Sequence, residues 1–106
     1  MAKSRVKELD ITRNLKVVEW LKAELVDSVG VLFKAFLKTG NEAKSDALAT
    51  IIIIAYLIGH KTGLSFSHID KKILNKLDTS IDASCEEEQW YADLADLLNY
   101  LEHKKR

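Results

Sequence analysis

Apolar residues recur every three or four positions between residues 10 and 38, which is the spacing of one face of a long helix. The positions are Leu15, Val18, Leu21, Leu25, Val29, Leu32 and Phe36. Gly40 is expected to end this helix, because glycine adopts the left-handed conformation that other residues avoid. Gly30 lies inside the pattern and costs about 1 kcal/mol relative to alanine, so we expect close helix packing at that point.

The next apolar segment, DALATIIIIAYLIGHKTG at residues 46–63, contains four consecutive isoleucines. Isoleucine favours strands, but the segment has no turn residue before Gly59 and the chain offers no partner strand. The apolar run from Ala47 to Ile58 is shorter than the roughly 20 residues of a membrane-spanning helix. We interpret the segment as a helix buried on most of its circumference, capped by Asn41 and ended by the basic turn before Gly63.

Two capping boxes predict two further helices. The box at residues 67–70 opens a short helix that is expected to end at about Leu77, and the box at residues 84–87 opens a last helix. One apolar stripe of this last helix contains Trp90, Leu94, Leu97, Leu98 and Leu101. The sequence therefore predicts an all-α fold of about four helices in one domain over residues 1–106, with a core at 10–81 and an extra helix at 84–104.

Composition narrows the function classes. The chain has 106 residues, 47% of them hydrophobic, and its sixteen basic residues balance sixteen acidic ones. Because its formal net charge is zero, the chain as a whole is not attracted electrostatically to nucleic acid or to an anionic membrane. Neither is therefore an expected partner, although short basic clusters lie at both termini. The single cysteine, Cys85, excludes an internal disulfide and, with a charged N-terminus, indicates a cytoplasmic protein.

Acidic residues three or four apart share a face of a helix and offer oxygen ligands to Mg²⁺. Two pairs have this spacing, Glu24 with Asp27 and Glu42 with Asp46. Such pairs are also common on solvated helices, so the spacing alone is a weak signal. The three histidines lie near expected helix ends or in the tail, and no Ser-His-Asp pattern accompanies them.

The segment Ile-Gly-His-Lys-Thr-Gly-Leu-Ser at residues 58–65, followed by Lys76-Leu77, resembles the MazG-like all-α nucleotide pyrophosphohydrolases. The resemblance covers residues 14–77. It implies antiparallel helices, usually assembled as a dimer or a dimer of dimers, that bind Mg²⁺ through a Glu-Glu-x-x-Glu and a Glu-x-x-Asp motif. It further implies cleavage of a nucleoside triphosphate to the monophosphate and pyrophosphate, with Lys76 as a possible phosphate contact.

The two family motifs fall on residues that mostly lack carboxylates. Aligned through Gly63, Glu-x-x-Asp falls on residues 47–50, and aligned through Leu32-Phe33, Glu-Glu-x-x-Glu falls on residues 24–28. Four positions that ligate metal in the family carry no acid: Leu25, Ser28, Ala47 and Thr50. A divalent ion buried among them would lose its hydration without compensating charge, so the sequence predicts an empty site if this alignment holds.

Two hypotheses follow from these residues. In the first, the chain is a degenerate MazG-like protein without pyrophosphohydrolase activity or cofactor, which forms a homodimer or tetramer and binds a protein partner or a nucleotide. In the second, it is a Mg²⁺-dependent pyrophosphohydrolase with a displaced acidic site at Glu24, Asp27, Glu42 and Asp46. A third, a nucleic-acid-binding helical regulator, depends only on the basic tips.

Overall fold

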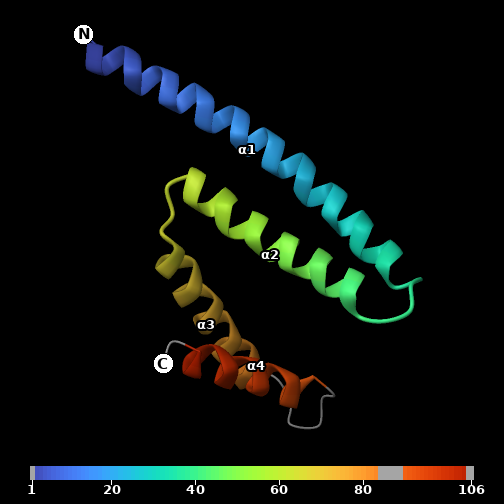
Figure 1. Ribbon diagram of the computed structural model, residues 1–106. Helices are drawn as coiled ribbons and strands as arrows, with labels where there is room; N and C mark the ends of the chain where they lie inside the picture. The colour runs from blue at the N-terminus through green and yellow to red at the C-terminus, as the bar shows by residue number, and fades with distance from the viewer. Residues whose placement is uncertain (1, 84–89, 105–106) are drawn as a thin grey trace. The chain divides into compact units, whose positions relative to one another are not determined.

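The computed structural model describes residues 2–83 and 90–104, with the side chains of residues 11–82 and 90–104. Over this range the chain forms four helices and no strand, which confirms the expected all-α class. They are α1 (Ala2–Ala35), α2 (Glu42–Lys61), α3 (Phe66–Ala83) and α4 (Tyr91–His103), drawn in Figure 1. The chain divides into two compact units, Met1–Phe66 and Ser67–Arg106, which are described separately.

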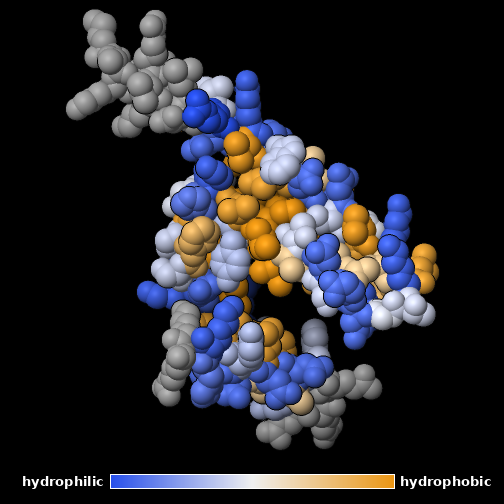
Figure 2. Space-filling view, in the orientation of Figure 1, coloured by the Kyte–Doolittle hydropathy of each residue, from blue (hydrophilic) through white to orange (hydrophobic). Residues whose placement is uncertain are grey.

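The first unit is an antiparallel hairpin in which α1 and α2 pack along one another (Figure 1). The apolar pattern of the sequence predicted only part of the buried line of α1. Val18 and Leu21 are buried and Leu25 and Leu32 half-buried as expected, whereas Leu15, Val29 and Phe36 are exposed and Ser28 and Ala35 are buried instead. On α2, Ala47, Ile54 and Gly59 are buried. The seam formed by these residues is the core of the hairpin. Figure 2 shows further hydrophobic side chains gathered on the surface near the middle of the hairpin.

The first helix is longer at its start and shorter at its end than the apolar pattern predicted. It begins at Ala2 rather than near Asp10, because residues 2–9 contain no glycine or proline and continue the helix. It ends at Ala35, and tighter i to i+3 bonds carry the backbone on to Lys38. Gly40 has the expected left-handed conformation, φ 88°, but lies in the connection rather than at the helix end.

The two ends of α2 differ in how well the sequence predicted them. Asn41 precedes the helix but makes no side-chain capping bond, because its backbone is already near-helical at φ −110° and ψ −6°. At the other end the prediction is confirmed. Gly63 has φ 101°, and the Leu64 and Gly63 amides donate to the Gly59 and His60 carbonyls at 2.9 and 3.2 Å. This pair of bonds is the Schellman motif.

Two packing predictions for the hairpin are wrong. The described side chains of α2 are not buried on most of its circumference, since Ile52 and Ile53 are 56% and 57% exposed and the seam with α1 covers one side only. Gly30 is exposed, and a methyl group added there would meet no atom within 4 Å. Close packing therefore does not explain Gly30.

The second unit contains α3 and α4. The third helix begins at Phe66 and runs to Ala83, so Ser67 lies inside its first turn rather than capping it, and the helix passes the expected end at Leu77. Leu77 is its buried residue. On α4, Leu94, Leu98 and Leu101 are half-buried as one stripe. The other two residues of the predicted stripe are exposed, namely Leu97 and Trp90, which precedes the helix. The expected capping box at residues 84–87 and Cys85 lie outside the described residues.

Candidate functional site

The four positions aligned with family metal ligands lie along the α1–α2 seam. Ser28 and Ala47 are 7% and 2% exposed, and Leu25 and Thr50 are half-buried. Ser28 is seven residues before the end of α1 and Thr50 eight residues after the start of α2. At 1.5 Å per residue both therefore lie about 11 Å from the connecting loop. Ser28 and Thr50 thus lie at a similar height in the hairpin, while Leu25 is about 15 Å and Ala47 about 8 Å from the loop.

Their side chains do not provide a site for Mg²⁺. The Thr50 hydroxyl donates to the carbonyl oxygen of Asp46, one turn back on its own helix, at 2.9 Å. The Ser28 hydroxyl is not left buried without a hydrogen-bond partner. The side chains of Leu25 and Ala47 contain no oxygen that could bind a metal ion. Mg²⁺ requires several oxygen ligands with compensating negative charge, so the residues present do not fit the ion.

The acidic residues of the alternative site lie outside the seam. Asp27, Glu42 and Asp46 are exposed and Glu24 is half-buried. The helical rotation of about 100° per residue places both pairs on the same face of the hairpin, here called the acidic face. The pairs lie at different heights, because Glu24 is about 16 Å and Asp46 about 6 Å from the loop. Among the described residues no three His, Cys, Asp or Glu side chains gather for a metal ion.

An aromatic cluster at the far end of α2 was not predicted from the sequence. The His60 ring stacks on the Phe66 ring at 5.0 Å between centroids, and the Tyr56 ring meets the edge of Phe66 at 6.0 Å. A shallow hollow beside it is lined by His60, Phe66 and the glycine turn between them. The signal in the sequence was the four-residue spacing of Tyr56 and His60, which places both on one face of a helix before a tight turn.

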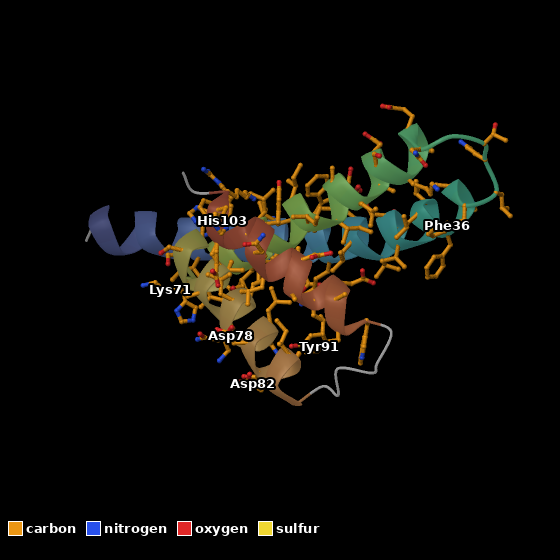
Figure 3. All side chains as sticks on the ribbon, turned by 90° about the horizontal axis from the view of Figure 1, so that it is seen from below. Phe36, Lys71, Asp78, Asp82, Tyr91 and His103 are labelled. Atoms are coloured by element: carbon orange, nitrogen blue, oxygen red, sulfur yellow. The ribbon has the colours of Figure 1, made fainter. Side chains whose placement is uncertain are left out.

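Lys76, which the sequence predicted as a possible phosphate contact, is exposed on α3. A shallow hollow there is lined by Lys72, Asn75, Lys76, Thr79 and Ser80. Figure 3 labels neighbouring charged residues of the same helix, Lys71, Asp78 and Asp82. The hollow therefore offers both cationic and hydroxyl groups, on the helix that belongs to the second compact unit.

By length and composition, α2 is the one helix among the described residues that is apolar enough to cross a membrane. The helix is 20 residues long and includes the charged first turn that precedes the apolar run. Core helices of globular domains meet the same criterion, so the observation alone is weak. That the chain has no membrane partner stays a prediction.

Comparison with protein families gives one finding. The model of the MazG-like family matches residues 11–94, which include α1 from Ile11, all of α2 and α3, and the start of α4. Comparison with curated proteins and with solved structures gave no match.

Proposed function

The chain belongs to the MazG-like family, and we propose that it is a member without nucleoside triphosphate pyrophosphohydrolase activity. The proposal rests on the identity of the side chains in the α1–α2 seam. At the positions where the family's carboxylates are expected to align, this chain has Leu25, Ser28, Ala47 and Thr50, of which Ser28 and Ala47 are buried. Without carboxylates there, no divalent ion activates water or neutralises a triphosphate.

A protein of this kind acts through binding rather than through chemistry. We assign it the role of a homo-oligomeric helical scaffold, a dimer or a tetramer, that binds a protein partner or a nucleotide in the cytoplasm. Exposed large apolar side chains on both helices of the hairpin support this role, since contiguous exposed apolar surface marks sites of protein association.

The proposal is tested by incubating the purified full chain with Mg²⁺ and a panel of nucleoside triphosphates while released pyrophosphate is measured. The expected result is no release above a blank, and no binding heat when Mg²⁺ is titrated in. Turnover that stays with the protein through successive purification steps would refute the proposal.

One observation favours the alternative of a displaced site, namely that Glu24, Asp27, Glu42 and Asp46 share the acidic face. The matched variant for this alternative is Asp46→Asn, which removes one charge at an exposed position without changing its size. Pyrophosphate release that this variant abolishes would establish the displaced site. Release that it leaves unchanged would point to a contaminating enzyme.

A further inference from the structure

We draw no further inference here: the strongest candidate, the surface patch of exposed apolar side chains where α1 meets the connection to α2 (Phe33, Phe36 and Leu37), carries none because nothing in the structure shows what covers it.

Discussion

The four consecutive isoleucines give the sharpest test of how α2 is oriented. Ile54 is 6% exposed in the seam, and Ile53 beside it is 57% exposed on the acidic face. The change Ile54→Ala removes three buried carbon groups, worth about 2.4 kcal/mol at about 0.8 kcal/mol each. The cavity left behind raises the loss, while alanine's better helix propensity returns about 0.4 kcal/mol. We expect a net loss of about 3 kcal/mol.

The matched control is Ile53→Ala, which makes the same chemical change one residue earlier. Less than half of this side chain is removed from water, so the same arithmetic gives about 1 kcal/mol before the gain in helix propensity. The net loss should be about 0.5 kcal/mol. The two variants therefore differ by roughly 2.5 kcal/mol, although their compositions are identical.

Urea unfolding followed by far-ultraviolet circular dichroism measures the difference. With a slope of about 1.3 kcal/mol per molar urea for a chain of this size, the midpoint should fall by about 2 M for Ile54→Ala and by less than about 0.5 M for Ile53→Ala. Both are compared at one protein concentration, because assembly shifts apparent stability. Equal midpoints would refute the orientation of α2, and with it the placement of Ala47 and Thr50.

Other predictions follow from the glycines and from the seam. Gly63→Ala should lower the free energy of unfolding by about 1 kcal/mol, because φ is 101° there, whereas Gly30→Ala should raise it by up to about 1 kcal/mol, because the position is helical and open. Thermal melts of the two variants should move in opposite directions. Ala47→Glu should cost several kcal/mol by burying an unpaired carboxylate, and an unchanged melting temperature would place residue 47 at the surface. The variant with carboxylates at all four aligned positions should be stabilised by Mg²⁺ in the same assay.

The sequence predicted only part of the seam, because apolar residues spaced three and four apart indicate a helix but do not decide which of two adjacent lines faces the partner. Leu15, Val29 and Phe36 were expected on the inner face and are exposed. The positions Leu21, Leu25 and Leu32 were expected on the inner face of α1, and the structure places them there, buried or half-buried. The turn that ends α2 was predicted correctly, since Gly63 after a basic last turn indicates a left-handed residue and the hydrogen bonds around it. Both features depend on local backbone geometry and on a single partner helix.

Helix starts were predicted less well, because a capping residue must also have the right backbone conformation. Asn41 has a suitable side chain but a near-helical backbone, and it makes no capping bond. Ser67 has a suitable partner three residues later, yet α3 begins at Phe66, so the helix starts one residue before the residue expected to cap it. The composition of a capping box does not fix which of two nearby serines, 65 or 67, precedes the helix.

The side chains that occupy the seam in place of carboxylates bear on the stability of the hairpin as well as on the proposed loss of activity. Carboxylates at the four aligned positions would lie along the seam between two helices and repel one another unless a divalent ion lay between them. With Leu25, Ser28, Ala47 and Thr50 the seam closes without an ion, since the Thr50 hydroxyl is satisfied by its own helix and Ala47 is buried. If the proposed loss of the metal site is right, packing alone stabilises the hairpin. It follows that removing divalent ions with a chelator should leave its stability unchanged, which is the behaviour expected of a scaffold.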